Sequence, residues 1–201
     1  MKKKITKVWI TGATGMVGGS LKKLLKNKKN LKILSPKRNE LNLLDQKAVY
    51  KWCKKNKPDH VYMTAAMVGG IYANSTYPAE FIYNNIQIQN NIIDAARLNS
   101  VKRLVFIGSS CIYPKYCKQP IKEKYLMTGP LEETNQWYAI AKIAGLKMIE
   151  SYRKQYGLKF VSVMPTNMFG PNDNYHEKNS HVLAALIKKL EIAKKKNSKL
   201  V

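Results

Sequence analysis

Residues 11–19, TGATGMVGG, contain the pattern that most strongly indicates the fold. It follows the short β-rich run KVWIT (7–11) and opens a segment whose apolar residues have helical spacing. Its glycines are Gly12, Gly15 and Gly18. After a first strand, the first glycine permits a tight turn, the second lets the backbone approach a pyrophosphate, and the third lets the helix pack on the sheet. The stretch therefore predicts a dinucleotide-binding loop, with a glycine turn that holds no ligand as the alternative.

Strand-like and helix-like segments alternate along the rest of the chain. We predict further strands at 31–34, 60–66, 103–108 and 159–165, and helices at 16–28, 45–56, 79–99, 134–156 and 181–195. This alternation predicts a Rossmann-type, doubly wound α/β fold, with a parallel sheet and helices on both faces. One domain covers residues 1–201, because no internal repeat or linker interrupts the pattern. Cys53 shares an apolar helix face, so we expect it to be buried.

Composition limits the class of protein. The net charge is +24, from 36 basic and 12 acidic residues. The lysines form no single stripe and no nucleic-acid-binding motif is present, so we favour a solvated surface over nucleic-acid binding. No apolar run reaches the roughly 18 residues of a membrane span, and the N-terminus lacks a signal peptide, so we expect a cytoplasmic protein. The three cysteines form no CxxC pair, which argues against a disulfide framework and a metal site.

The end of the second strand indicates which dinucleotide is bound. An NAD site usually carries Asp or Glu there, for the ribose 2′-hydroxyl. This chain has Lys37 and Arg38 instead, and a guanidinium can bind a 2′-phosphate through two hydrogen bonds. We therefore expect NADP(H) rather than NAD. Two alternatives stay open: the cations are ordinary surface charges, or Glu40 binds the ribose of NAD.

The segment YAIAK places Tyr138 and Lys142 four residues apart, on one face of a helix. A lysine cation beside a phenol favours the phenolate and lowers the phenol pKa, so Tyr138 could exchange a proton at a carbonyl carbon that takes part in hydride transfer. Ser109 or Ser110, after the fourth strand, would bond the carbonyl oxygen. A tyrosine in an ordinary helix core is the alternative.

Together, TGATGMVG, the serine after the fourth strand and YAIAK resemble the extended short-chain dehydrogenase/reductase family. Longer segments narrow the resemblance to the GDP-L-fucose synthases within it: GSSCIYPK (108–115), YAIAKIAGLKMIESY (138–152), VMPTNMFGPNDN (163–174) and NSHV (179–182). The resemblance spans essentially the whole chain. It implies 3,5-epimerisation of GDP-4-keto-6-deoxy-D-mannose, followed by reduction at C4 with NADPH to give GDP-L-fucose.

The resemblance also implies residue roles. Tyr138 is the proton donor, Lys142 is its partner at the nicotinamide ribose, and Ser109 contacts the keto oxygen. Cys111 and His181 are the acid–base pair of epimerisation, and His181 and Lys189 meet the substrate. The full set of expected cofactor-binding residues is Gly12, Ala13, Thr14, Gly15, Met16, Val17, Gly18, Arg38, Ile107, Gly108, Ser109, Ser110, Lys142, Pro165, Thr166, Asn167 and Met168.

Three further expectations follow from the resemblance. The partners are a GDP-sugar substrate and a second copy in a homodimer, with no nucleic acid and no membrane. Relatives dimerise through the helix with YAIAK and the helix before the fourth strand; Ile143, Leu146 and Ile149 would supply such a face or pack on the sheet. We expect the C-terminal substrate-binding segment of relatives to be largely absent. Another NAD(P)-dependent nucleotide-sugar epimerase or dehydratase, or a catalytically silent dinucleotide-binding module, remains an alternative.

Overall fold

The central element of the fold is a parallel β-sheet. The computed structural model describes residues 5–176 and 179–197. Five parallel strands lie in the order β2-β1-β3-β4-β5, with bounds Thr6–Thr11 (β1), Leu31–Leu34 (β2), His60–Met63 (β3), Arg103–Ile107 (β4) and Phe160–Val163 (β5). The order reverses between β1 and β3. In open α/β sheets, the crevice for a ligand lies at this switch point, beyond the carboxyl ends of the strands.

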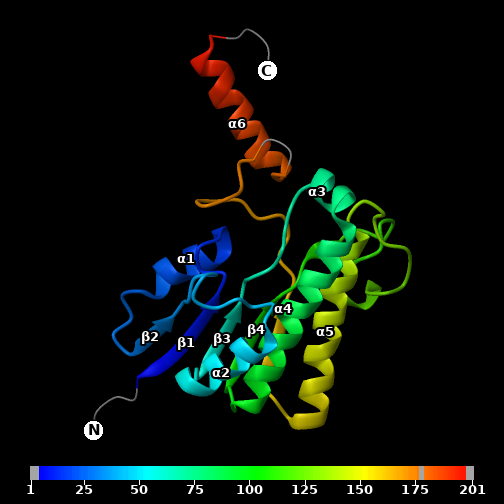
Figure 1. The fold of residues 1–201 in the computed structure, drawn as a ribbon. Coiled ribbons are helices and arrows are strands. Elements are labelled where there is room, and N and C mark those ends of the chain that lie inside the picture. The colour runs from blue at the N-terminus through cyan, green and yellow to red at the C-terminus, as the bar shows by residue number, and fades with distance from the viewer. Residues whose placement is uncertain (1–4, 177–178, 198–201) are drawn as a thin grey trace.

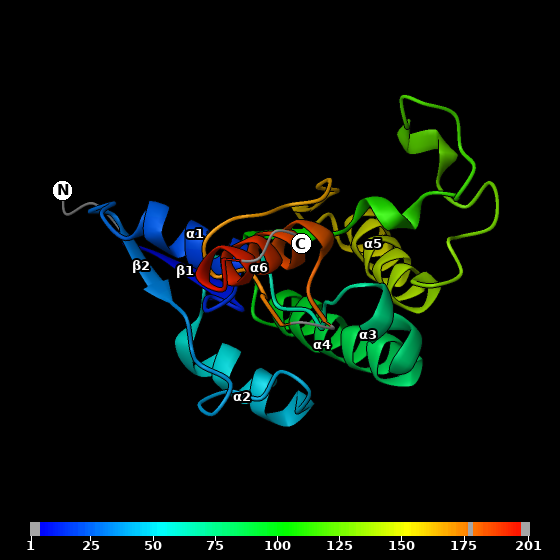
Figure 2. The same ribbon diagram turned by 90° about the horizontal axis from the view of Figure 1, so that it is seen from above.

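Helices cover the two faces of the sheet unequally. Their bounds are Met16–Leu25 (α1), Gln46–Asn56 (α2), Ile71–Thr76 (α3), Pro78–Leu98 (α4), Gln136–Tyr156 (α5) and Val182–Lys195 (α6). α1 lies on one face, and α2, α4 and α5 lie on the other (Figure 1). α6 stands beyond the carboxyl edge of the sheet (Figure 1), and in the view from above it lies between α1 and α5 (Figure 2). The predicted doubly wound α/β fold is confirmed.

The core lies between the sheet and α2, α4 and α5. Trp9, Phe106 and Phe160 from the strands are wholly buried against apolar residues of these helices. Cys53 is also fully buried there, as its helix face predicts. Leu146 and Ile149 are core residues and Ile143 packs against them, so the sheet-packing alternative for these three side chains is correct.

Hydrogen bonds explain where element ends differ from the sequence prediction. β3 ends at Met63 rather than at residue 66, because the Thr64 hydroxyl donates to the carbonyl of Thr11. The Ala65 N–H then donates to Oγ1 of Thr11 at 3.1 Å, which turns the chain away from the ladder. α3 was not predicted, since six residues are too few for an apolar period to appear.

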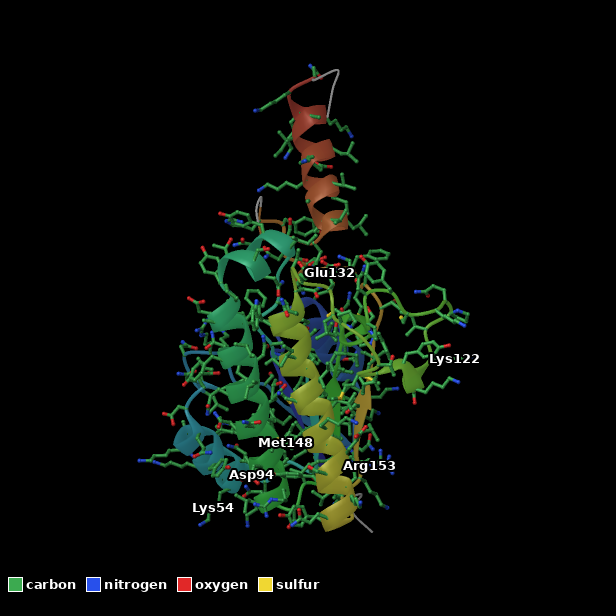
Figure 3. All side chains as sticks on the ribbon, turned by 90° about the vertical axis from the view of Figure 1, so that its right-hand side faces the viewer. Lys54, Asp94, Lys122, Glu132, Met148 and Arg153 are labelled. Atoms are coloured by element: carbon green, nitrogen blue, oxygen red, sulfur yellow. The ribbon has the colours of Figure 1, made fainter. Side chains whose placement is uncertain are left out.

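The far ends of α4 and α5 are joined by a polar cluster centred on Asp94. Its carboxylate accepts hydrogen bonds from the Tyr50 hydroxyl (2.5 Å), Nε of Arg97 (2.8 Å) and the Tyr152 hydroxyl (3.0 Å). Burial tends to raise the Asp94 pKa, but these donors outweigh burial and lower the pKa. Figure 3 shows Asp94 on α4, at the end away from α6. The cluster therefore stabilises the packing of α2, α4 and α5 at a distance from the carboxyl edge of the sheet.

Within residues 5–176 and 179–197, none of the helices combines the length and apolar character needed to cross a bilayer.

Candidate functional site

The glycine loop has the backbone geometry that the sequence predicts. Gly12 has a φ of +66°, and its carbonyl accepts a hydrogen bond from the Gly15 N–H at 3.0 Å. A Cβ at Gly12 would lie 2.8 Å from Cα of Ala65, which follows β3. A Cβ at Gly18 would lie 2.3 Å from the Gly12 carbonyl oxygen. Both positions therefore require glycine, one for the turn and one for packing of α1.

The same loop leaves room for a phosphate. A Cβ at Gly15 would meet only the Gly12 carbonyl oxygen, at 3.5 Å, and Gly15 is exposed. Gly15 caps α1 without a side-chain hydrogen bond, and the first turn of α1 has no acidic residue. The N–H groups at the start of α1 have no side-chain cap from Gly15, and N–H groups at such a helix start fit a dinucleotide pyrophosphate. Of the loop's other predicted residues, Thr14 is exposed, while Ala13, Met16 and Val17 are half-buried.

The segment after β2 presents cations rather than a carboxylate. Oε2 of Glu40 accepts a hydrogen bond from the Lys37 N–H at 2.6 Å, so this carboxylate is used within its own turn. Lys37 and Arg38 are exposed. β2 pairs with β1, so these cations follow the strand beside the glycine loop. The geometry thus favours the NADP(H) interpretation over the Glu40 alternative.

The ends of β4 and β5 lie side by side. The Gly108 N–H donates to the Val163 carbonyl at 2.8 Å, and a Cβ at Gly108 would lie 3.1 Å from Sδ of Met164. The two predicted cofactor segments, 107–110 and 165–168, therefore continue from adjacent points of one sheet edge. In the second segment Thr166, Asn167 and Met168 are exposed and Pro165 is half-buried.

Ser109 and Cys111 form a direct pair after β4. Ser109 caps a 3₁₀ turn, Ser110–Ile112, and its Oγ lies 2.8 Å from Sγ of Cys111. Burial raises the pKa of the Cys111 thiol, while the Ser109 hydrogen bond and the Lys142 charge act in the opposite direction. Of the two serines left open by the sequence, Ser109 is the one bonded to the predicted acid–base group.

Tyr138 and Lys142 meet on α5, facing the end of β4. Nζ of Lys142 lies 5.5 Å from the centroid of the Tyr138 ring and donates to the Ile107 carbonyl at 2.8 Å. Lys142 is only 4% exposed, and burial lowers its pKa from 10.5 to about 8. Burial, with a smaller contribution from Cys111, raises the pKa of Tyr138. The expected lowering of the Tyr138 pKa is therefore wrong, because burial of the hydroxyl disfavours the charged phenolate.

His181 and Lys189 belong to a separate part of the site. His181 is exposed at the residue before α6, and its side chain makes no cap hydrogen bond. Lys189 is exposed about two turns further along α6. Among the hydrogen bonds of the described residues, none joins Cys111 to His181. The predicted epimerisation pair therefore comes from two elements, the β4 end and the α6 start, that are not in hydrogen-bond contact.

The structure adds two residues that the sequence analysis missed. Gln89, on α4, is 1% exposed, and its Nε2 donates to the Ala141 carbonyl, directly before Lys142, at 2.7 Å. Phe81 packs edge-on against Tyr138, with ring centroids 6.4 Å apart. A polar side chain in the apolar face of a long helix was the available signal for Gln89. Phe81 carried no local signal, because its contact joins two distant helices.

Comparison with known proteins matches almost the whole chain to one protein family. Residues 8–201 match the model of the NAD dependent epimerase/dehydratase family. GDP-L-fucose synthase of Escherichia coli K12 is 51% identical over 192 residues, which are 96% of this chain and 60% of that protein. The chain therefore spans about 60% of the length of this relative.

Solved structures agree with the sequence comparison. A GDP-6-OMe-4-keto-L-xylo-heptose reductase from C. jejuni superposes with a TM-score of 0.90 at 41% identity, covering 96% of this chain and 55% of the other. A GDP-mannoheptose C4 reductase from Campylobacter jejuni with NADP bound gives a TM-score of 0.87, also at 41% identity, covering 96% and 57%. Both names describe reduction of GDP-linked sugars.

Proposed function

Because this chain belongs to the NAD dependent epimerase/dehydratase family, we propose that it binds NADP(H) and acts on GDP-4-keto-6-deoxy-D-mannose. The proposed reaction is epimerisation at C3 and C5 followed by reduction at C4, giving GDP-L-fucose. The observation that carries this proposal is the 2.8 Å contact between Oγ of Ser109 and Sγ of Cys111. Reduction at C4 needs Tyr138, Lys142 and a serine; a thiol bonded to that serine adds the acid–base group that epimerisation requires.

The chain's own residues support each proton movement. Ser109 would bond the C4 oxygen of the substrate, which stabilises the negative charge that forms when a C3 or C5 proton leaves. Cys111 and His181 would remove a proton from one face of the ring and return one to the other. The 4-keto group makes this possible, since it acidifies the hydrogens on both neighbouring carbons.

Reduction would use the α5 pair. Tyr138 would give its hydroxyl proton to the C4 oxygen, and the Lys142 cation would stabilise the phenolate that remains. Bound NADPH would supply the hydride to C4. The N–H groups at the start of α1 would hold the pyrophosphate, and Arg38 would bind the 2′-phosphate.

We test the two half-reactions separately, in D₂O. With NADP⁺ no hydride is available, so deuterium at C3 and C5 of the sugar, read by mass spectrometry, reports proton exchange alone. Cys111→Ser should lose this exchange and still bind NADPH, whereas Tyr138→Phe should keep exchange and lose NADPH oxidation. Cys117→Ser is the matched cysteine control. Equal loss of exchange and NADPH binding in Cys111→Ser would mean that Cys111 has a structural role.

A C4 reductase without epimerase activity is the second candidate. It is favoured by the names of the two solved structures at 41% identity. NADPH oxidation without deuterium at C3 or C5 would identify this function. NADPH binding without oxidation or exchange would identify a silent dinucleotide-binding module.

We also propose that the chain forms a homodimer through α4 and α5. These helices pack side by side (Figure 1), and Tyr83, Trp137 and Ile140 remain exposed on them at 65%, 39% and 36%. Light scattering of wild type and Trp137→Glu tests this surface. A wild-type chain that is monomeric in solution would contradict the proposed homodimer.

A further inference from the structure

The segment that leads into His181 is docked on the turn before α3. The Gly70 N–H donates to the Asn179 carbonyl at 3.1 Å. A Cβ at Gly70 would lie 2.5 Å from the Ser180 carbonyl oxygen, whereas ordinary contacts begin at 3.4 Å. Gly70 has a φ of −68°, which any residue adopts, so closeness to Ser180 is the constraint at this position.

Asn74 fixes that turn from within α3. It is 4% exposed, and its Nδ2 donates to the carbonyls of Gly69 (2.8 Å) and Gly70 (3.1 Å). Its own N–H also donates to the Gly70 carbonyl, at 3.1 Å. One buried side chain therefore holds both glycines in the conformation that receives residues 179–180.

The turn also touches the reducing half of the site. A Cβ at Gly69 would lie 3.3 Å from Cζ of Phe81, and Phe81 packs edge-on against Tyr138. Phe81 therefore lies next to both Tyr138 and the Gly69–Gly70 turn, and the same turn is hydrogen-bonded to the segment before His181. Tyr138 on α5 and His181 before α6, two of the proposed proton-transfer groups, are therefore both linked to this turn.

Unpaired polar atoms indicate that the junction is not built for stability alone. Among the described residues, Oδ1 of Asn74, Oδ1 of Asn179 and Oγ of Ser180 are buried without a hydrogen-bond partner. Burial of such atoms is unfavourable, so each one calls for an explanation other than stability.

The geometry points to Gly70 and Asn74 as positioning residues that set the place of His181 for proton exchange, an inference that rests on the proposed function. Gly70→Ala keeps the backbone conformation and the N–H donor, but forces Ser180 away by almost 1 Å. A displacement of that size at a catalytic group costs up to about 100-fold in rate. We expect deuterium exchange at C3 and C5 to fall roughly 10- to 100-fold, with NADPH affinity unchanged.

Two further variants guard against a trivial loss of folding. Asn74→Asp keeps the side-chain shape but removes the Nδ2 donor, and should lower exchange in the same direction. Gly129→Ala is the matched control, because its Cβ would meet only Pro114, at 3.3 Å, outside this junction. Circular dichroism and thermal melts confirm that each variant is folded.

The His181 imidazole Hε1 resonance provides a readout that needs no turnover. His181→Gln assigns the resonance, and His60, on β3, is the internal reference. We expect Gly70→Ala and Asn74→Asp to move the His181 signal, and Gly129→Ala to leave it in place. A folded Gly70→Ala chain with an unmoved His181 signal and unchanged exchange would overturn the inference. A moved signal in a chain whose wild type lacks all exchange would support positioning and refute the proposed function.

Discussion

Lys142→Met should stabilise this protein while abolishing its proposed reduction. The Lys142 pKa is lowered from 10.5 to about 8, because the ammonium group is almost completely removed from water. That difference corresponds to an unfavourable burial of charge of roughly 3 kcal/mol at neutral pH. Methionine has similar length and no charge, so it removes this cost.

Two losses reduce the gain. The hydrogen bond from Nζ to the Ile107 carbonyl disappears, at a cost of about 1 kcal/mol. The cation also lies 4.9 Å from the Phe106 ring centroid, and that contact contributes about 1 kcal/mol more. The net stabilisation is about 1 kcal/mol, which raises Tm by roughly 2–4 °C in a chain of this size.

The pH dependence checks the cause. A lysine whose pKa is lower in the folded state destabilises the fold fully below that pKa. The cost fades as pH rises from about 8 toward 10.5, where both states become neutral. The advantage of Lys142→Met should therefore be complete at pH 7 and shrink above pH 8, measured by urea unfolding. A Lys142→Met variant that is less stable than wild type at pH 7 would mean that the buried charge is not the dominant cost at this position.

Four further substitutions test the glycine loop, the cofactor site and the Asp94 cluster. Gly18→Ala should lower the unfolding free energy by about 1–3 kcal/mol, because its Cβ would lie 2.3 Å from a carbonyl oxygen. Gly15→Ala should fold normally and weaken NADPH binding. A destabilised Gly15→Ala chain beside a Gly18→Ala chain of normal stability, measured by calorimetry, would contradict the loop assignment. Arg38→Ala should weaken NADPH binding about 10- to 100-fold in fluorescence titrations and leave NADH binding unchanged, since a charged hydrogen bond contributes about 1.5–3 kcal/mol. An equal loss of affinity for NADPH and NADH would mean that Arg38 does not bind the 2′-phosphate. Asp94→Asn should cost about 1–2 kcal/mol at pH 7. Because the Asp94 pKa is lowered in the folded state, this difference should narrow as pH falls below about 4, and a constant difference would mean that its charge is not involved.

Local patterns made the fold predictable. The spacing of Gly12, Gly15 and Gly18 and the alternation of strands and helices are short-range features. The structure has the five strands and the other five helices in the predicted order, with the short α3 in addition. Cys53 was placed in the core by its helix face alone, and it is fully buried. Such properties depend on neighbours in sequence, which one chain displays directly.

Properties that depend on distant contacts were not predictable. The tyrosine–lysine spacing brought Tyr138 and Lys142 together, but the direction of the Tyr138 pKa depends on burial by other elements. The docking of Asn179 on Gly70 joins residues more than 100 positions apart. A turn-forming glycine pair in the sequence cannot reveal which segment packs against it.

We expect this chain's own residues to form the NADP(H) site, and calorimetric titration of the 201-residue chain with NADPH measures whether they do. The binding should be saturable and one-to-one, should survive Cys111→Ser, and should be weakened by Gly15→Ala and Arg38→Ala. No binding by a folded wild-type chain, or binding indifferent to both Gly15 and Arg38, would contradict it.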